Sequence, residues 1–291
     1  MNSYISEWIA IRYGKDLSVN EMENAFTETV QSVILQALSS SSSFFRKAAF
    51  YGGTCLRFCY GMERFSEDLD FSLKVPDISF DLESFFPQIK KNLSLYGLDM
   101  EVEMRKKKAF SQVQSAFVKG NTLVNFVNVF SIEPPVSGIA VNRKLTVKFE
   151  IDTDPPCDAT YEERAVNSFL YPFSVLCYDL PSQFAGKIDA VLMRNWKNRV
   201  KGRDFFDYLW FLHHGVHVNT SNLKARLKQH SGKDWSEADI RSGLHERFAL
   251  VDFSAAVEDV SPFVSGLALE SIRSWSGSLF SMMTDQYLVF S

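Results

Sequence analysis

The order of hydrophobic and polar positions separates a first half that mixes helices and strands from a second half that is mostly helical. Apolar residues recur about every 3.6 positions over residues 18–39, and this period predicts a helix that buries one face. Residues 144–151 instead alternate between apolar and polar, which predicts a half-buried strand. Similar apolar or alternating runs predict strands at 48–51, 68–73, 98–105, 112–119 and 123–130, and helices at 55–60 and 80–95.

Strand patterns fade after residue 181, where helical periods take over. We expect helices at 181–195, 204–213, 221–229 and 236–248, with one or two more near the end of the chain. The sequence therefore predicts an α+β fold, in which a mixed sheet with flanking helices is followed by a helical C-terminal region. We place a first domain, with its N-terminal helices, at 1–175 and a helical domain at 176–291; the boundary falls between residues 161 and 181.

Composition narrows the class of protein without naming an activity. Hydrophobic residues make up 46% and charged residues 23% of the chain, which is ordinary for a globular protein and excludes a disordered one. The formal net charge of −4 means that any site for a polyanion must be a local basic patch. Residues 1–16 show no signal peptide and no apolar run reaches about 18 residues, so we expect a cytoplasmic protein without a membrane span.

The four cysteines predict no disulfide framework. They show no CxxC spacing and are too sparse for such a framework in a chain of this length. We expect reduced, mostly buried thiols at Cys55, Cys59, Cys157 and Cys177.

Two aspartates at the start of an apolar strand are the first candidates for chemistry. Because side chains alternate along a strand, Asp68 and Asp70 share one face while Leu69 points into the core. Two like charges this close repel each other, and a bound cation such as Mg²⁺ removes that repulsion. Alone, such a pair is more often a solvated strand end; transfer of a phosphoryl or nucleotidyl group is the chemistry that would need it.

A glycine turn that precedes these aspartates strengthens the hypothesis. Gly52-Gly53-Thr54 follows a predicted strand and opens a helix, so it places free backbone N–H groups and the positive end of a helix where a phosphate can bind. The Thr54 hydroxyl and the Arg57 guanidinium are further candidates for phosphate binding, and Ser66 for nucleotide binding. A plain tight turn would explain the glycines alone, but the turn and the aspartates in this order form a more specific signal.

A third carboxylate is expected on a neighbouring strand. The alternation over residues 144–152 places Lys148, Glu150 and Asp152 on the polar face of that strand. Glu150 or Asp152 would supply the third acid, and Glu150 is slightly favoured because it lies within the regular part of the strand. A solvated strand face is the alternative explanation.

Three segments in a fixed order resemble a known family. YGGTCLRFCYGMERFSEDLDFSL (51–73) resembles the first motif block of the AbiEii/AbiGii nucleotidyltransferase toxins. FAGKIDAVLMR (184–194) is similar to the lysine helix of that family, and KGRDFFDYLWFL (201–212) to its Lys-Gly-Arg-Asp block. The resemblance is patchy between residues 74 and 178 and ends near residue 215. These toxins are the enzymatic half of bacterial abortive-infection, type IV toxin–antitoxin systems, and their fold is similar to the minimal nucleotidyltransferases of the DNA-polymerase-β superfamily.

The resemblance implies a substrate, cofactors and a site. A nucleoside triphosphate (NTP) would bind with two Mg²⁺ ions in a cleft that the helical domain completes. Asp204 would be a functional acid, although its place in the first turn of a predicted helix is equally explained by the helix dipole. Lys187 would otherwise be a solvated residue on a helix face. The other implied roles are phosphate binding by Gly52, Gly53 and Thr54, metal binding by Asp68 and Asp70, and contact with the triphosphate by Lys187.

Two basic stretches are candidates for binding an RNA backbone. One is residues 105–108, and the other joins the last two motif blocks and contains Arg194, Lys197, Arg199, Lys201 and Arg203. Solvated surface charge is the alternative. Because the family includes members that add nucleotides to transfer RNA (tRNA), the resemblance implies a tRNA acceptor near the second stretch and an AbiEi-like antitoxin as a partner.

These observations favour an enzyme that moves a nucleoside monophosphate from an NTP to an acceptor and releases pyrophosphate. Glu150, Asp152 or Asp204 would accept the proton of the acceptor hydroxyl. A transferase that modifies a protein or an antibiotic would use the same site with another acceptor groove. The competing class is a regulatory protein that binds an NTP or an antitoxin without turnover, but such a protein is free to lose the two aspartates.

Overall fold

The computed structural model describes residues 3–14, 17–41, 43–105, 112–121, 144–166, 171–195 and 199–291. The chain divides into two compact units. The first comprises Met1–Tyr60, Ser66–Pro155 and Glu163–Cys177, and the second comprises Gly61–Phe65, Pro156–Glu162 and Tyr178–Ser291. The second unit thus includes two short segments that precede its main stretch. The strand predicted at 123–130 lies outside the described residues.

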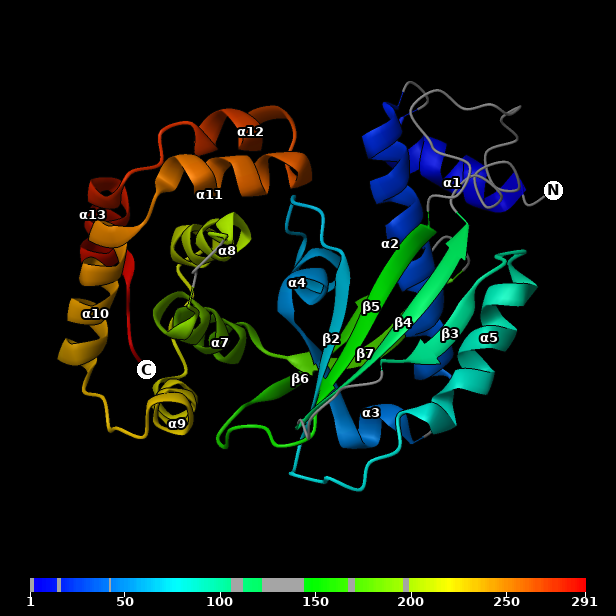
Figure 1. Cartoon of the computed structure of the whole chain (residues 1–291), viewed down its shortest axis with the longest axis horizontal. Coiled ribbons are helices and arrows are strands. Elements are labelled where there is room, and N and C mark those ends of the chain that lie inside the picture. The colour runs from blue at the N-terminus through cyan, green and yellow to red at the C-terminus, as the bar shows by residue number, and fades with distance from the viewer. Residues whose placement is uncertain are drawn as a thin grey trace. The chain divides into compact units, whose positions relative to one another are not determined.

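A mixed sheet is the central feature of the N-terminal part of the chain (Figure 1). Its strands are β1 (Ala48–Tyr51), β2 (Asp68–Leu73), β3 (Glu101–Met104), β4 (Val113–Asn121), β5 (Lys144–Asp152), β6 (Tyr161–Val166) and β7 (Phe173–Tyr178). They are ordered β3-β4-β5-β2-β1-β7-β6. β1 is parallel to β7 and β2 to β5, whereas β1–β2, β3–β4 and β4–β5 are antiparallel. This order brings β2 and β5, which carry the predicted acids, side by side.

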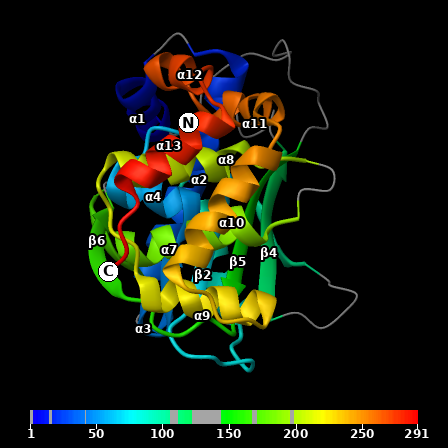
Figure 2. The same ribbon diagram turned by 90° about the vertical axis from the view of Figure 1, so that its left-hand side faces the viewer.

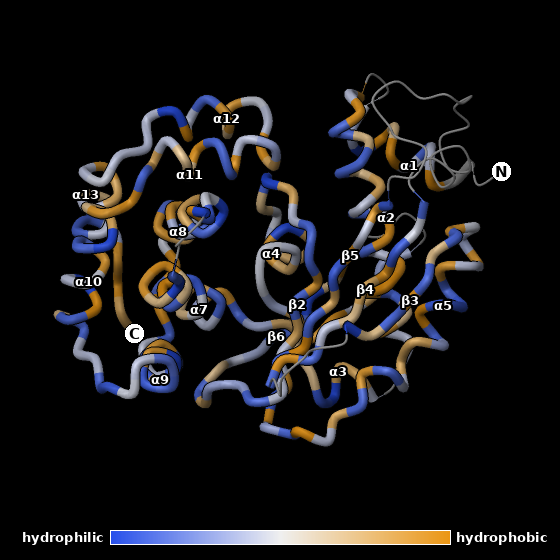
Figure 3. Tube along the Cα trace, viewed as in Figure 1, coloured by the Kyte–Doolittle hydropathy of each residue, from blue (hydrophilic) through white to orange (hydrophobic). Residues whose placement is uncertain are grey.

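Helices bury one face of this sheet. They are α1 (Ser3–Tyr13), α2 (Val19–Ser39), α3 (Phe44–Lys47), α4 (Gly52–Tyr60) and α5 (Phe86–Leu95), with a 3₁₀ turn at Glu83–Phe85. α2 begins with a capping box, in which Ser18 and Glu21 satisfy each other's backbone N–H groups, and it packs against β5 and α5. Phe71 of β2 and Phe149 of β5 are fully buried, with ring centres 5.1 Å apart in an edge-to-face contact. Figure 3 shows the alternation of hydrophilic and hydrophobic residues along these two strands.

The second unit is mostly helical (Figure 2). It contains α7 (Leu180–Met193), α8 (Gly202–His213), α9 (Thr220–Ser231), α10 (Glu237–Leu250), α11 (Phe253–Val260), α12 (Gly266–Ile272) and α13 (Gly277–Tyr287), with a 3₁₀ turn at Ser261–Phe263. α7 packs against α8, α9 and α10, while α8 also packs against α11 and α13. At Gly202, where α8 begins, an added Cβ would lie 1.8 Å from the carbonyl oxygen of Ala256, so only glycine allows this approach of α8 to α11.

The predicted α+β class is confirmed, and so are most of the predicted elements. α2, β1, β2 and β5 and the helices α7 to α10 lie within three residues of their predicted bounds. The helix predicted at 80–95 begins only at Phe86, because Asp77 and Asp81 accept hydrogen bonds from the N–H groups of Ser79 and Glu83 and hold the preceding chain in turns. α1, α3, β6 and β7 were not predicted. Among the described residues, every helix is too short or too polar to cross a membrane.

Candidate active site

The glycine turn starts a helix one residue after a strand ends. β1 ends at Tyr51, and α4 begins at Gly52, three residues earlier than predicted. Gly52 has a φ of +82°, a backbone conformation that favours glycine. The first N–H groups of a helix have no partner within it and point along its axis with the positive end of the helix dipole. The turn therefore offers an anion site of the kind that binds phosphate.

The glycine turn and the aspartates lie side by side. Tyr51 and Asp70 are partners in the antiparallel pairing of β1 with β2, which brings the first residue of α4 next to Asp70. A Cβ added at Gly52 would lie 2.7 Å from Oδ2 of Asp70 and 3.3 Å from its Cβ. The backbone of the turn is thus in van der Waals contact with the Asp70 side chain. A phosphate on the turn and a cation on Asp70 would be neighbours.

Four acids line the same face of β2 and β5. The parallel register pairs Asp68 with Lys148, Asp70 with Glu150 and Ser72 with Asp152. All five of these charged side chains are half-buried, whereas the intervening residues are fully buried, as the predicted alternation requires. Asp68, Asp70 and Glu150 therefore share the polar face of the sheet with Asp152 at its end.

Glu150 is held in place by two neighbours. Ser115 of β4 donates a hydrogen bond from Oγ to Oε1 of Glu150 over 2.6 Å, and Lys148 forms an ion pair with Oε2. In the described part of the chain, no three carboxylates bring their oxygens within 4.8 Å of one another. The predicted metal ligands Asp68 and Asp70 offer two half-buried carboxylates on the same face of β2. That set fits Mg²⁺, which usually binds one or two carboxylates together with substrate phosphates.

Thr54 and Arg57, predicted to contact phosphate, have other partners in the structure. The buried Thr54 hydroxyl donates its one hydrogen to the backbone carbonyl of Asp68, which joins α4 to β2. Arg57 forms an ion pair with Glu28 of α2, and both side chains are almost fully buried. These contacts favour a structural role for both residues, because both polar groups are already engaged within the protein.

Ser66 is also buried, two residues before Asp68. Its carbonyl oxygen accepts a hydrogen bond of 2.9 Å from the side-chain amide of Gln31, so α2 fixes the chain directly ahead of β2. The whole Ser66 residue is 9% exposed, which leaves little surface for contact with a nucleotide. We therefore retain Gly52, Gly53, Asp68 and Asp70 as the core of the candidate site in the first unit.

Lys187 and Asp204 meet in the second unit. Nζ of Lys187 lies 2.8 Å from Oδ1 of Asp204 and 2.8 Å from Oδ2 of Asp207, and Arg194 also pairs with Asp204. Arg64 completes this cluster with a two-point contact to Asp207 at 2.5 and 2.7 Å. Asp207 lies one turn after Asp204 on α8, whereas Arg64 could not be predicted, because no local pattern marks a contact between residues so far apart in the chain.

The two acids of this cluster are held as carboxylates. Burial alone would raise the pKa of Asp204, but the charges of Lys187 and Arg194 outweigh burial and lower it to about 2. Burial likewise opposes ionisation of Asp207, yet Arg64 and Lys187 lower its pKa below the ordinary value. A carboxylate with so low a pKa is a poor proton acceptor. This favours Glu150 or Asp152 over Asp204 as a general base.

The basic stretch predicted to bind RNA is largely engaged within the protein. Arg194 pairs with Asp204, Arg199 with Asp259, and the Arg203 guanidinium lies 4.3 Å from the ring centre of Phe263. Lys201 precedes α8, and Lys197 lies outside the described residues. In the other stretch, Arg105 lies 5.9 Å from the ring centre of Phe117, while residues 106–108 are not among those described. Arg194 and Arg199 keep side chains that are 45% and 65% exposed, so contact with a polyanion stays open to them.

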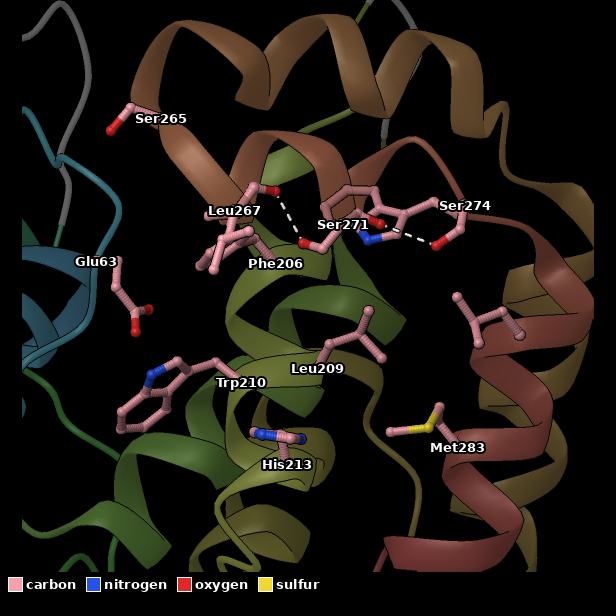
Figure 4. Close-up of a pocket in the computed structure, with 13 residues that line it drawn as sticks. Glu63, Phe206, Leu209, Trp210, His213, Ser265, Leu267, Ser271, Ser274 and Met283 are labelled. Atoms are coloured by element: carbon pink, nitrogen blue, oxygen red, sulfur yellow. Dashed lines mark hydrogen bonds between the residues drawn. The ribbon is translucent and has the colours of Figure 1, made fainter.

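A separate cavity of about 780 Å³ lies within the second unit (Figure 4). Phe206, Trp210, Leu267 and Trp275 give it a mainly apolar wall. Glu63 is the one carboxylate among its lining residues, and His213 lies at its wall as well. Because two acids are needed to hold the metal ions of nucleotidyl transfer, this cavity is not a second candidate for that chemistry.

Comparisons with known proteins give the family. The profile of the family described as nucleotidyl transferase AbiEii toxin, type IV TA system, matches residues 33–272. No curated protein matches the chain. JHP933 from Helicobacter pylori has 19% sequence identity, and the superposition covers 92% of this chain and 90% of JHP933 with a TM-score of 0.49. A second H. pylori structure, described as a candidate nucleotidyltransferase, has 19% identity, covers 92% and 95% of the two chains and has a TM-score of 0.48. The family match spans most of the sequence, and the chain therefore belongs to the AbiEii nucleotidyltransferase toxin family of type IV toxin–antitoxin systems.

Proposed function

We propose that this protein transfers a nucleoside monophosphate from an NTP to an acceptor hydroxyl and releases pyrophosphate. The observation that carries this proposal is the close approach of Gly52 to Asp70. A methyl group on Gly52 would collide with a carboxylate oxygen of Asp70. Family membership supports the reaction class. The contact supports the site, because phosphate and metal must be neighbours for this chemistry.

Each group in the first unit has a task in this proposal. The backbone N–H groups of Gly52 and Gly53 hold phosphate oxygens at the start of α4. Asp68 and Asp70 hold Mg²⁺, with two ions expected for this class of reaction. The metal would neutralise charge on the phosphates and lower the pKa of the attacking hydroxyl. Thr54 fixes α4 to the backbone of Asp68 and so sets the distance between the turn and the acids.

Glu150 is the proposed proton acceptor. Its register with Asp70 places it on the same face, and Ser115 orients its carboxylate through a hydrogen bond. Asp152 lies farther along β5 and accepts a hydrogen bond of 3.0 Å from the backbone N–H of Asp154, so it is the second choice. A role of Lys187 in contacting the triphosphate stays a prediction from the resemblance, as does a role of Asp204.

The proposed acceptor is the 3′ end of a tRNA, and the proposed regulator is an AbiEi-like antitoxin. Both come from the family rather than from the geometry. The exposed guanidinium groups of Arg194 and Arg199 would contribute to binding the RNA backbone. A protein or small-molecule acceptor, or NTP binding without turnover, would be recognised by the outcome of the following experiment.

The test is label transfer by the purified full chain. The protein is incubated with Mg²⁺, each NTP labelled on its α-phosphate and total RNA, and the RNA and protein fractions are separated. Label in the tRNA fraction is expected. Label in protein would replace the RNA acceptor by a protein, and no transfer with any NTP would overturn the proposed reaction in favour of a binding protein.

The metal assignment is tested with Asp70→Asn. Loss of a metal ligand should reduce transfer by at least about 100-fold, or about 3 kcal/mol of transition-state stabilisation, while the thermal unfolding curve stays close to that of the parent chain. Glu101→Gln is the matched control, because Glu101 is an exposed acid on β3 of the same sheet and should leave transfer unchanged. An Asp70→Asn protein as active as the control would remove Asp70 from the metal site.

A further inference from the structure

Three of the four cysteines meet inside the first unit. Cys55 and Cys59 lie one turn apart on α4, and Cys177 lies on β7. Their Sγ atoms all lie within 4.8 Å of one another. The sequence predicted mostly buried thiols but not their positions relative to one another, and the fold brings three of the sulfur atoms together from two elements.

The cluster is enclosed but has one accessible side. Cys55 and Cys177 are fully buried, whereas Cys59 is half-buried and so provides a path from solvent. Tyr60 places its hydroxyl 3.5 Å from Sγ of Cys177, and the Arg164 guanidinium lies 4.6 Å from the ring centre of Tyr60. A positive charge therefore lies close to the three sulfur atoms.

Neighbouring groups stabilise one thiolate at this point. The thiols of Cys55 and Cys59 donate hydrogen bonds to Cys177 and, with Tyr60 and Arg164, lower the pKa of Cys177 well below that of an ordinary thiol. Burial raises the pKa of Cys55, so that sulfur keeps its proton in the absence of a cation. The three sulfur atoms lie close enough to one another to share a single ion.

We infer that Cys55, Cys59 and Cys177 form a binding site for one soft cation, with monovalent copper as the best match. Sulfur ligands select soft cations such as Cu⁺, whereas Mg²⁺ prefers the oxygen ligands of Asp68 and Asp70. In the described residues no fourth histidine, cysteine or acid joins the group. Zn²⁺ prefers four ligands in a structural site, so a three-sulfur site favours Cu⁺ over Zn²⁺.

Binding at this site is a ligand exchange without electron transfer. Each of the three sulfur atoms gives a lone pair to Cu⁺, and a cysteine that binds as a thiolate loses its S–H proton as it does so. Each proton released passes to water, and the copper stays monovalent. The resulting negative charge is partly offset by Arg164.

The position of the site gives it a structural consequence. α4 carries two of the three ligands and begins at Gly52, while Cys177 is the residue of β7 that pairs with Phe50 of β1. A bound cation would tie α4, which begins at the glycine turn, to β7, which pairs with β1. The inference concerns binding alone and does not depend on the proposed transfer reaction.

The test uses the reduced full chain under anaerobic conditions. Cu⁺ is titrated against a coloured Cu⁺ chelator, and one equivalent is expected to remain with the protein and to raise its unfolding temperature. Zn²⁺ is the second probe and should bind more weakly. Retention of Zn²⁺ but not Cu⁺, or of neither ion, would overturn the inference.

Single substitutions identify the ligands. Cys59→Ser changes the half-buried member of the cluster, and Cys177→Ser changes the buried member on β7. Loss of a residue that hydrogen-bonds a metal ligand lowers the affinity for the metal by about 10–100-fold. Loss of a ligand itself should therefore lower the affinity for Cu⁺ by at least about 100-fold. Cys157→Ser is the matched control, because Cys157 is exposed and belongs to the second unit. Circular dichroism checks folding of each variant, and a folded Cys59→Ser protein that binds Cu⁺ as well as Cys157→Ser would refute the site.

Discussion

Both the backbone conformation of Gly52 and the lack of space around it exclude a side chain at this position. Its φ of +82° is strained for other residues, and the Asp70 carboxylate lies where a Cβ would project. Gly61 and Gly215 also have a positive φ, but an added Cβ at either would meet no atom within 4 Å, whereas Gly52 combines both effects. Gly61 only makes a turn, whereas Gly52 also leaves room for the Asp70 carboxylate.

Gly52→Ala should therefore impair activity more than stability. A left-handed conformation costs about 1–2 kcal/mol for alanine, and displacement of Asp70 by the new methyl group should lower transfer by about 100-fold. Gly61→Ala is the control: its φ is +78°, and an added Cβ meets no atom within 4 Å. Both variants are compared by urea unfolding and by label transfer. Equal activity of the two would show that the contact with Asp70 has no part in the reaction.

The positions of individual side chains could be predicted where the alternation of a strand determines which face each side chain points to. Asp68, Asp70 and Glu150 could be placed on one face because strand side chains alternate, and the register of β2 with β5 confirms it. The partners of Arg57 and Thr54 could not be predicted from the sequence. Arg57 meets Glu28 from another helix, and Thr54 meets a backbone carbonyl, and neither contact leaves a local pattern.

At the scale of elements, one buried ion pair joins α2 to α4. Glu28 is 1% exposed and the Arg57 side chain 10%, so both charges have left water and depend on each other. A buried pair is costly to break because the remaining charge has no partner. Arg57 is thus better explained as the residue that positions α4 than as a ligand of phosphate.

A double-mutant cycle tests this explanation. Glu28→Gln and Arg57→Met should each cost about 3–5 kcal/mol in free energy of unfolding, and the double variant should cost less than their sum. The exposed pair Lys119–Glu103 is the control and should contribute no more than about 1 kcal/mol. If Arg57 bound phosphate, Arg57→Met would also raise KM for the NTP in the Glu28→Gln background; we expect no such increase.

The elements differ in how far local sequence determines them. α2 and β5 each bury one face over many residues, so the spacing of hydrophobic residues in the sequence predicts both elements. β6 was missed because YEERAV carries three charged residues in succession, a composition suited to the sheet edge where the structure places it. The site of the first unit could be partly predicted because several of its residues lie close together in the chain. The cysteine cluster could not be predicted, because it joins α4 to β7, which is distant in the sequence.

At the scale of the whole molecule, charge clusters connect segments that are remote in sequence. Arg64 belongs to the segment 61–65 of the second unit, whereas Lys187 and Asp207 lie on α7 and α8, and each of these side chains is at most 14% exposed. No single motif predicts such a cluster, since each member looks like an ordinary charged residue in its own segment. The short segment 61–65 belongs to the second unit through contacts of this kind.

This cluster should make the stability of the second unit depend on acid pH. The pKa of Asp204 falls from its ordinary 3.8 to about 2 on folding. A lowered folded pKa stabilises the native state above the unfolded value, and this contribution disappears as the pH falls from about 4 to about 2. Asp204 should thus contribute about 2 kcal/mol at neutral pH, to which Asp207, also with a lowered pKa, would add.

Urea unfolding between pH 7 and pH 2 measures this contribution, with fluorescence of Trp210, Trp235 and Trp275 reporting on the second unit. Asp204→Asn should be less stable than the parent chain by about 2 kcal/mol at pH 7, and the two curves should converge near pH 2, because only the parent has a carboxylate to protonate. Asp234→Asn is the control, since Asp234 is 86% exposed beside Lys228. A gap between Asp204→Asn and the parent that stays constant down to pH 2 would mean that the stabilisation comes from packing rather than from the charge of Asp204.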